Sequence, residues 1–368
     1  MVESGPFILS GGVVLTPSGW KETDLKVADG KITDQLDRRA REIDVSGMTI
    51  VPGFIDVQVN GGWGYDLQTD PSTLWALADS LTSVGVTSFL PTLTTDGIYN
   101  RYKAFDSWNT GPPDRAGFVG ADPLGWHLEG PWLAPSRHGA HSRHLLQPVP
   151  SAVPVDYCPS HGVRMVTLAP ELAGSLWAIG QLRSQGVVVS LGHSEATMAQ
   201  AMEAVAAGAT MGTHLFNAMS GLDHRSVGLA AALLLEDMYV GLIVDGYHVA
   251  PEMVDLSWRL ASTRILVVSD LVAARGDTDH EGLPVRNNAG ALAGATLGLD
   301  GAISNLMNFT GCGLAEAVRS VTEVPARCLG LTDRGWLEPG LRADVVALDS
   351  AGTVTLTLVE GRVAHDAR

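Results

Sequence analysis

One repeated pattern in the middle of the chain restricts its fold more than any other feature: short apolar runs alternate with segments of helical spacing. The apolar runs, each typical of a buried strand, are Ile50–Val59, Val86–Leu93, Gly125–Glu129, Arg164–Leu168, Val187–His193, Thr210–His214, Tyr239–Asp245 and Ile265–Asp270. Helix-like segments such as 71–85, 174–186 and 197–208 lie between several of them. Seven or eight strand–helix repeats predict an α/β fold, the (β/α)8 TIM-like barrel.

A doubly wound open sheet is the alternative that the same alternation allows. The first predicted strand is not followed by GxGxxG or by a P-loop, which disfavours that fold. Two long polar segments, Trp132–Ser160 and Leu271–Leu297, follow strand ends. Loops of this length usually have a function, and we expect the same of these two.

Both ends of the chain differ from the middle, because they consist of short strand-like pieces separated by turn residues. Neither end contains enough strands to be stable alone. We therefore predict that residues 1–50 and 338–368 form one small sheet domain, and that residues 51–337 form the barrel. Two unrelated additions to the barrel are the alternative.

Composition excludes several classes of function. The formal net charge of −16 predicts no nucleic-acid partner, although a few local cations can still bind a small phosphate. No apolar run approaches the ~20 residues of a membrane span, and the N-terminus shows no signal-peptide pattern. Cys158, Cys312 and Cys328 lack metal-ligand spacing. Free thiols are typical of a reducing compartment, so we predict a cytoplasmic protein.

Four ionisable residues end predicted strands: Glu129, His193, His214 and Asp270. Taken singly, each has a structural explanation, such as a turn residue or an Asp that caps the next helix. In a barrel, however, the carboxyl ends of the strands meet at one mouth. One Glu and two His make a three-ligand set for a catalytic divalent ion. Zn²⁺ fits best, with Fe²⁺, Mn²⁺ or Co²⁺ as alternatives, and Asp270 remains free to act as a base.

Further candidates lie in the loops after these strands. His141 follows Gly139 and Ala140, and we expect it to point inward, unlike the other basic residues of its loop. Asn217 and Arg225 are candidate ligand contacts. His248 comes after a strand end, behind Gly246; a binding role and a packing role are equally compatible with that position.

These motifs together resemble the N-acetylglucosamine-6-phosphate deacetylases of the amidohydrolase superfamily. The matching stretches occur in family order and are PGFIDVQVNGG (52–62), HLEGPWL (127–133), HGAH (138–141), LGHSEAT (191–197), GTHLFNAM (212–219), DGYHV (245–249), SD (269–270) and EPGLRADVVALD (338–349). The last stretch is common to many amidohydrolases, whereas HLEGP together with THLFNAM is specific. The resemblance implies a TIM-like barrel with a small β-sandwich domain made from both termini. It also implies metal-dependent hydrolysis of N-acetylglucosamine-6-phosphate to glucosamine-6-phosphate and acetate.

The resemblance also assigns roles. It implies that Glu129, His193 and His214 bind one metal ion, that Asp270 is general base and then acid, and that His141 binds the sugar and polarises the acetyl carbonyl. The sugar phosphate would be held by Asn217, the backbone of Ala218, Arg225 and His248. A homodimer is expected, because in this family a neighbouring subunit helps to shape the phosphate pocket.

Two departures from the family pattern stand out. Many amidohydrolases have His-x-His on the first barrel strand, where it binds a second metal; this chain has Gln58 and Asn60. Amides are poor ligands beside imidazole, so one metal is predicted. The family usually has Thr before the catalytic Asp and Ala after it, whereas this chain has Ser269 and Leu271. The larger Leu271 is expected to reshape the wall near the acyl group.

Three alternatives remain open at this point. One is a deacetylase of N-acetylgalactosamine-6-phosphate, and another is a deacylase of N-acyl amino acids. The cationic pair Arg225 and His248 favours a phosphorylated substrate over the second of these. The third is a non-catalytic sugar-phosphate sensor, which would not require Asp270 beside a metal site.

Overall fold

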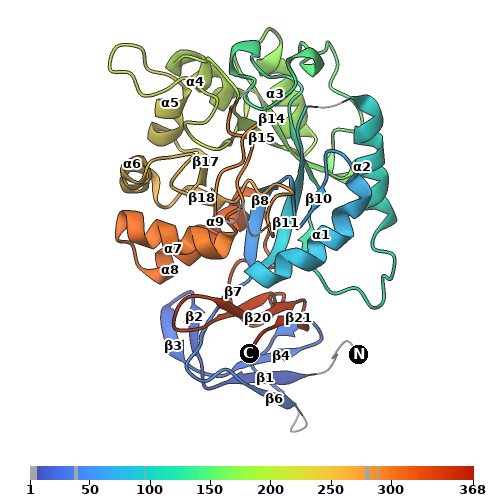
Figure 1. The fold of residues 1–368 in the computed structure, drawn as a ribbon, viewed down its shortest axis with the longest axis vertical. Helices are drawn as coiled ribbons and strands as arrows, with labels where there is room; N and C mark the ends of the chain where they lie inside the picture. Colours follow the sequence, from blue (N-terminus) through green and yellow to red (C-terminus); the bar gives the residue numbers. More distant parts are fainter. Residues whose placement is uncertain (1–5, 37–39, 96, 278–281, 288–289) are drawn as a thin grey trace.

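The structure is a computed structural model of the chain, and it describes residues 6–36, 40–95, 97–277, 282–287 and 290–368. Its centre is a barrel of parallel strands surrounded by helices (Figure 1). The eight barrel strands are β8 (Phe54–Val59), β11 (Val86–Leu93), β13 (Trp126–Glu129), β14 (Val163–Leu168), β15 (Val188–Leu191), β16 (Met211–Gly212), β17 (Tyr239–Ile243) and β18 (Ile265–Val268). They pair in sequence order, which confirms the predicted barrel and excludes the doubly wound sheet.

The barrel closes between its last strand and its first. The Asp270 N–H donates a hydrogen bond of 3.0 Å to the Gln58 carbonyl, and Leu271 forms a parallel bridge with Val59. The third barrel position is interrupted, since the short strand β12 (Asp122–Pro123) and β13 both pair with β11. Closure brings the carboxyl end of β8 beside the carboxyl end of β18.

The predicted strand Ile50–Val59 is in fact two strands. Its first half is β7 (Thr49–Pro52), which pairs outside the barrel, and only its second half is the barrel strand β8. Gly53 separates them, and a Cβ there would collide with the Thr87 side chain. The absence of a side chain at Gly53 therefore lets the chain pass from one sheet to the other.

Nine α-helices are described, and most of them surround the barrel: α1 (Leu74–Leu81), α2 (Ile98–Thr110), α3 (Ser175–Ser184), α4 (Met198–Ala207), α5 (Leu229–Leu235), α6 (Pro251–Ala261), α7 (Leu299–Thr310), α8 (Leu314–Arg319) and α9 (Glu323–Cys328). The predicted helical segments 71–85, 174–186 and 197–208 contain α1, α3 and α4. Helix α4 begins at a capping box of Thr197 and Gln200 and ends at the left-handed Gly208. Within the described ranges, none of the helices has the length and apolar character needed to span a bilayer.

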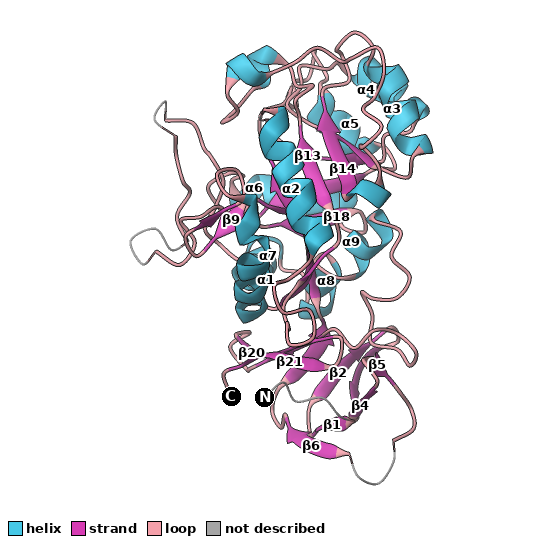
Figure 2. Ribbon diagram, turned by 90° about the vertical axis from the view of Figure 1, so that its right-hand side faces the viewer, coloured by secondary structure: helices cyan, strands magenta, loops and turns pink. Residues whose placement is uncertain are grey.

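Both chain ends build two smaller sheets next to the amino end of the barrel (Figure 2). One has the order β5 (Lys31–Ile32), β4 (Leu25–Ala28), β1 (Phe7–Ser10) and β6 (Arg41–Asp44). The other has the order β21 (Arg362–Asp366), β20 (Val354–Val359), β19 (Val345–Leu348), β7, β2 (Val13–Thr16) and β3 (Gly19–Glu22). Antiparallel pairing of β7 with β19 joins the two ends, and residues from both ends share one apolar core.

A buried ionic network connects the barrel to these sheets. Arg334, whose side chain is 9% exposed, donates hydrogen bonds of 2.8 Å to Ser88 on β11 and to Asp122 on β12. Arg342 pairs with Asp344 at 3.0 Å, and the Asp344 carbonyl accepts from the Gly53 N–H. The motif 338–349 therefore acts in the structure as a connector at the end of the barrel away from the strand-end residues.

Candidate active site

The four strand-end residues lie around one cavity at the carboxyl end of the barrel. The cavity has a volume of about 670 Å³, and Glu129, His193, His214 and Asp270 all line it. His193, His214 and Asp270 have φ angles of 49°, 28° and 51°, a left-handed conformation that non-glycine residues rarely adopt. Such strain is characteristic of functional sites, because it must be held by the surrounding structure.

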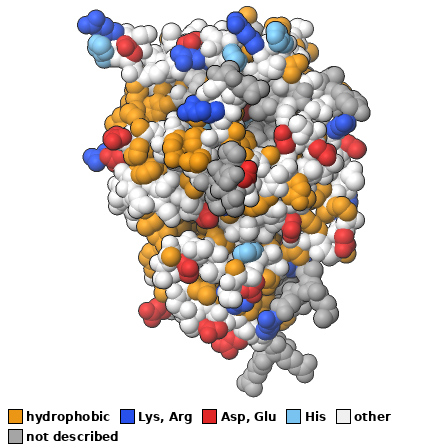
Figure 3. Space-filling view, in the orientation of Figure 1, with side chains coloured by type: hydrophobic (Ala, Val, Ile, Leu, Met, Phe, Trp, Pro, Cys, Tyr) orange, Lys and Arg blue, Asp and Glu red, His pale blue; other side chains and the backbone are white. Residues whose placement is uncertain are grey.

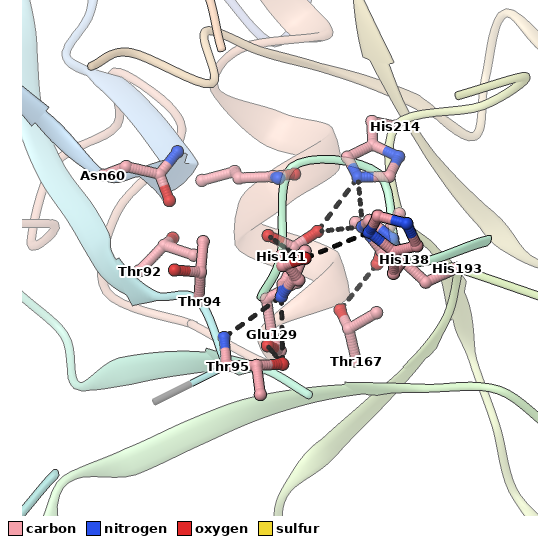
Figure 4. A network of polar contacts seen from close by, with 12 residues as sticks. Asn60, Thr92, Thr94, Thr95, Glu129, His138, His141, Thr167, His193 and His214 are labelled. Carbon is pink, nitrogen blue, oxygen red and sulfur yellow. Dashed lines mark hydrogen bonds and ion pairs between the residues drawn. The ribbon is translucent and has the colours of Figure 1, made fainter. Parts of the chain in front are cut away.

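Glu129, His193 and His214 point their ligand atoms at one another (Figure 4). Glu129 Oε1 is 3.0 Å from His193 Nε2 and 2.9 Å from His214 Nε2, and the two nitrogens are 3.2 Å apart. All three side chains are buried. Two imidazole nitrogens and a carboxylate oxygen converging in this way fit a divalent metal ion such as zinc.

A hydrogen bond outside this trio fixes the orientation of His193. His193 Nδ1 donates to the Arg137 carbonyl at 2.8 Å, so Nε2 keeps its lone pair for a metal. Burial lowers the pKa of His193 to about 4, so its ring is neutral at physiological pH. The loop of Arg137 is itself held by a bidentate ion pair with Glu195, at 2.6 and 3.1 Å.

Glu129 remains ionised in this setting. Burial disfavours the charged carboxylate, but the adjacent imidazoles of His141, His193 and His214 outweigh it and hold the pKa of Glu129 well below its usual range. The trio therefore offers one anionic ligand and at least one neutral imidazole. That combination is appropriate for a cation with charge +2.

His141 lies beside the trio, with Nε2 3.6 Å from Glu129 Oε2 (Figure 4). Its Nδ1 accepts a hydrogen bond of 3.1 Å from the Thr95 N–H. A ring nitrogen that accepts from an N–H carries no proton, so in neutral His141 the proton is on Nε2. The side chain is buried and lines the cavity, where Nε2 can donate to a bound carbonyl.

Asp270 lies across the cavity from these residues. Its Oδ1 accepts from Gln58 Nε2 at 3.1 Å and from Asn60 Nδ2 at 2.7 Å. Burial, followed by the charge of Glu129, raises the pKa of Asp270 to about 6. A carboxylate with a pKa close to neutrality can both accept and return a proton.

Three other predicted contacts also line the cavity: Asn217, Ala218 and His248. His248 Nδ1 is 2.6 Å from Asp245 Oδ2, and Asp245 Oδ1 accepts from the N–H groups of Tyr247 and His248. Because His248 lines the cavity, its position also allows a contact with a bound ligand. The His248 side chain is only 4% exposed, so this arrangement is compatible with both the binding and the packing interpretation of His248.

Arg225 is placed differently from the other candidates. It is exposed and does not line the cavity of its own chain. It lies on a turn bounded by the Leu222–Val227 bridge, and its N–H bonds to Asp223. In Figure 1 the chain between α4 and α5 projects outward from the barrel, and Figure 3 shows basic, acidic and histidine side chains together at that corner.

Leu271 also differs from expectation. Its side chain is fully buried in the main apolar core and does not line the cavity. The expectation that Leu271 shapes the acyl wall is therefore wrong: its position in the barrel closure turns it inward. The apolar wall comes instead from residues further along the same loop, namely Val272, Ala273, Ala274, Val285, Ala291, Leu292 and Ala293.

A chain of hydrogen bonds beneath the metal ligands could not be predicted from the sequence. We call His127, Thr167, Thr213 and Ser190 the polar belt. His127 donates from Nδ1 to the Val57 carbonyl at 3.1 Å, and its Nε2 is 2.7 Å from Thr167 Oγ1. Thr213 Oγ1 is 2.7 Å from Thr167 Oγ1 and 2.5 Å from Ser190 Oγ. The one sequence signal was that His127 precedes Glu129 by two residues, on the same face of a strand.

Comparison with known proteins agrees with this geometry. Residues 49–364 match the amidohydrolase family model, so the chain belongs to the amidohydrolase family and is a hydrolytic enzyme. It is 36% identical, over 97% of its length and 99% of the relative, to an N-acetylgalactosamine-6-phosphate deacetylase of Escherichia coli O157:H7. It is 34% identical, over 95% of its length and 92% of the relative, to an N-acetylglucosamine-6-phosphate deacetylase of Caenorhabditis elegans.

A solved structure extends the similarity to the fold. A mutant N-acetyl-D-glucosamine-6-phosphate deacetylase of Mycobacterium smegmatis, in complex with N-acetyl-D-glucosamine-6-phosphate, is 31% identical and superposes with a TM-score of 0.87. The match covers 98% of this chain and all of that chain. The family resemblance read from the sequence motifs is thereby confirmed.

Proposed function

We propose that the protein hydrolyses the N-acetyl group of N-acetylglucosamine-6-phosphate, giving glucosamine-6-phosphate and acetate. One observation carries this proposal: the trio Glu129, His193 and His214 converges beside Asp270 and His141 in one cavity. The near full-length similarity to deacetylases of amino-sugar phosphates supports the substrate class.

The trio would hold one divalent ion, for which we propose Zn²⁺, with Fe²⁺, Mn²⁺ and Co²⁺ as alternatives. When bound, such an ion supplies an acidified water molecule and polarises the amide carbonyl. The protein residues then do the following. Asp270 takes a proton from the attacking water, while His141 Nε2–H donates to the carbonyl oxygen as it gains negative charge. Asp270 returns the proton to the leaving amine.

The phosphate lies further out in this scheme. We assign it to His248 Nε2, the Asn217 side chain and the Ala218 backbone, because all three residues border the cavity. Anchoring a remote phosphate holds the amide at the reacting groups.

Arg225 would act from a second copy of the chain. Its turn exposes the apolar side chains of Leu222 and Val227, 45% and 41% exposed, which a partner subunit would cover. We therefore propose a homodimer in which each Arg225 reaches the phosphate in the partner's cavity. We further propose that residues 1–50 and 338–368 form the β-sandwich domain and residues 51–337 the barrel domain. The three free thiols are compatible with a cytoplasmic location.

Deacetylation of N-acetylgalactosamine-6-phosphate is the second candidate, and the E. coli O157:H7 relative favours it. The two sugars differ at one hydroxyl, whereas the residues described above address the acetyl and phosphate groups. A deacylase of N-acyl amino acids and a non-catalytic sensor fit less well. The first has no need of a phosphate site, and the second has no need of Asp270.

Acetate release from the purified protein tests the proposal. The protein is stripped with a chelator, one divalent metal is returned, and three substrates are compared: both 6-phosphates and unphosphorylated N-acetylglucosamine. We expect metal-dependent release that is fastest with N-acetylglucosamine-6-phosphate. Faster release from the galactosamine epimer would transfer the assignment to it, and no release by the metal-loaded protein would reject both.

A further inference from the structure

Two amide side chains of the first barrel strand bind the same oxygen of Asp270. Gln58 Nε2 and Asn60 Nδ2 both donate to Oδ1, at 3.1 and 2.7 Å. An ionised carboxylate can only accept, so each amide must present its NH₂ group. Oδ2 receives no hydrogen bond from the described part of the chain, which makes it the oxygen that is free to exchange a proton.

The barrel closure dictates this arrangement. The hydrogen bond from the Asp270 N–H to the Gln58 carbonyl sets the register between β8 and the residues after β18. Residues 58 and 60 lie two apart on one strand, so their side chains point to the same side, toward Asp270. Gln58 is only 1% exposed and cannot turn its amide toward solvent.

The orientation of both amides is unfavourable for their own oxygens. Gln58 Oε1 and Asn60 Oδ1 are buried without a hydrogen-bond partner among the described residues. Unsatisfied buried acceptors destabilise a fold. A pair of amides selected for stability alone would pair these oxygens, so the arrangement points to a function that depends on the two donors.

The charged groups around Asp270 show why neutral donors suit this position. The charge of Glu129 raises the pKa of Asp270, while His214 and His248 lower it. Asp56 also interacts with Asp270, but burial raises the pKa of Asp56 itself to about 7. Neutral amides can hold the carboxylate without forming an ion pair. A Lys or Arg in their place would bind the carboxylate more tightly and weaken it as a base.

We propose that Gln58 and Asn60 are positioning residues that occupy Oδ1 of Asp270, so that proton transfer in the reaction runs through Oδ2. This inference rests on the proposed function, because it assigns the atom of Asp270 that exchanges the proton. Gln58 and Asn60 stand where many amidohydrolases have the two histidines of His-x-His. The proposal gives both amides one shared task that does not involve binding a metal.

Two variants of similar size without donors, Gln58→Leu and Asn60→Leu, test the proposal in the zinc-loaded enzyme. We expect kcat to fall about tenfold to a hundredfold, with KM and zinc content close to the parent values. The acid limb of the kcat/KM profile should move upward by about one pH unit, because hydrogen bonds that favour the ionised carboxylate are lost. Gln147→Ala, at an exposed glutamine outside the cavity, is the matched control and should change neither quantity.

Unchanged kcat and an unchanged acid limb in both variants would overturn the proposal. A loss of activity that only accompanies a loss of zinc or a lower unfolding midpoint would also overturn it, because such a loss indicates a structural role for the amides. A readout without substrate separates this inference from the proposed function. Infrared difference spectra against Asp270→Asn report protonation of Asp270 directly, and we expect its titration to shift upward in both variants. If the parent deacetylates none of the sugars, the proposed function fails, while the infrared titration still tests the amide pair.

Discussion

The backbone N–H of Thr95 donates a hydrogen bond of 3.1 Å to Nδ1 of His141 and thereby decides which nitrogen of that ring carries the proton. A backbone donor cannot become an acceptor, so neutral His141 has its N–H at Nε2, beside Glu129. The Nε2–H of His141 is therefore oriented before a substrate binds, at the position where it can donate to a bound carbonyl.

This relationship predicts different outcomes for two amide substitutions at His141. The side-chain nitrogen of Gln reaches about as far as Nε2, whereas that of Asn reaches only as far as Nδ1. We expect His141→Asn to lower kcat by a factor on the order of a hundred to a thousand and His141→Gln to lower it less. Steady-state kinetics on the zinc-loaded proteins measures both, and equal losses would show that the Nε2 donor is not the important group.

From the role proposed for Asp270 we predict how kcat/KM depends on pH and that replacing Asp270 abolishes activity. Because its pKa is raised to about 6, the carboxylate is ionised above that pH and protonated below it, where it cannot accept a proton. The kcat/KM of the parent should therefore fall about tenfold per pH unit below pH 6. Asp270→Asn should abolish turnover at every pH while keeping the metal and the fold. Metal analysis and circular dichroism are the controls, and a variant with near-normal rate would exclude Asp270 as the base.

Asp56 predicts how stability depends on pH. Burial raises its pKa from 3.8 to about 7, and its Oδ2 has no hydrogen-bond partner in the described residues. The folded protein therefore binds a proton at Asp56 more tightly than the unfolded chain does. The stability from this group is complete below pH 3.8 and is lost as the pH rises toward 7. Asp56→Asn should remove this loss, so that urea denaturation gives a larger free energy of unfolding for the variant at neutral pH. A variant less stable than the parent there would contradict the prediction.

The polar belt predicts an effect on metal affinity that does not depend on substrate. It ties β13, β14, β15 and the residue directly after β16 together, just below Glu129, His193 and His214. Thr167→Val removes the central hydroxyl while keeping the shape, and we expect zinc affinity to fall about tenfold. Competition with a chromophoric chelator measures it. Thr23→Val, at an exposed threonine far from the barrel mouth, should leave the affinity unchanged; equal affinities for all three proteins would refute a role for the belt.

Arg225 predicts complementation between subunits. Arg225→Ala should mainly raise KM for the phosphorylated sugar, by about ten- to a hundredfold for a lost charge-assisted contact. Mixed with the inactive Asp270→Asn chain, it should regain activity, because one cavity of the proposed dimer would then combine Asp270 of one chain with Arg225 of the other. Activity no greater than that of Arg225→Ala alone would place the phosphate contact elsewhere.

Much of the fold was predictable because it follows from local patterns. The strand Val86–Leu93 has the predicted bounds, and α3 and α4 lie within segments whose apolar spacing indicates helices. The chain passes from β7 to β8 at Gly53 inside one continuous apolar run. That division could not be predicted, because residues on either side of Gly53 pair with partners from distant parts of the chain.

The same distinction applies to the site. By itself, the sequence determined that Glu129, His193, His214 and Asp270 gather at one mouth, since residues that follow parallel barrel strands must meet there. Only the tertiary structure decided that Gln58 and Asn60 hold Asp270, that Thr95 orients His141, that Leu271 turns into the core and that Arg225 lies outside its own cavity. A residue's place at the end of a strand follows from its immediate neighbours, whereas a hydrogen bond between residues 58 and 270 depends on the register in which the barrel closes.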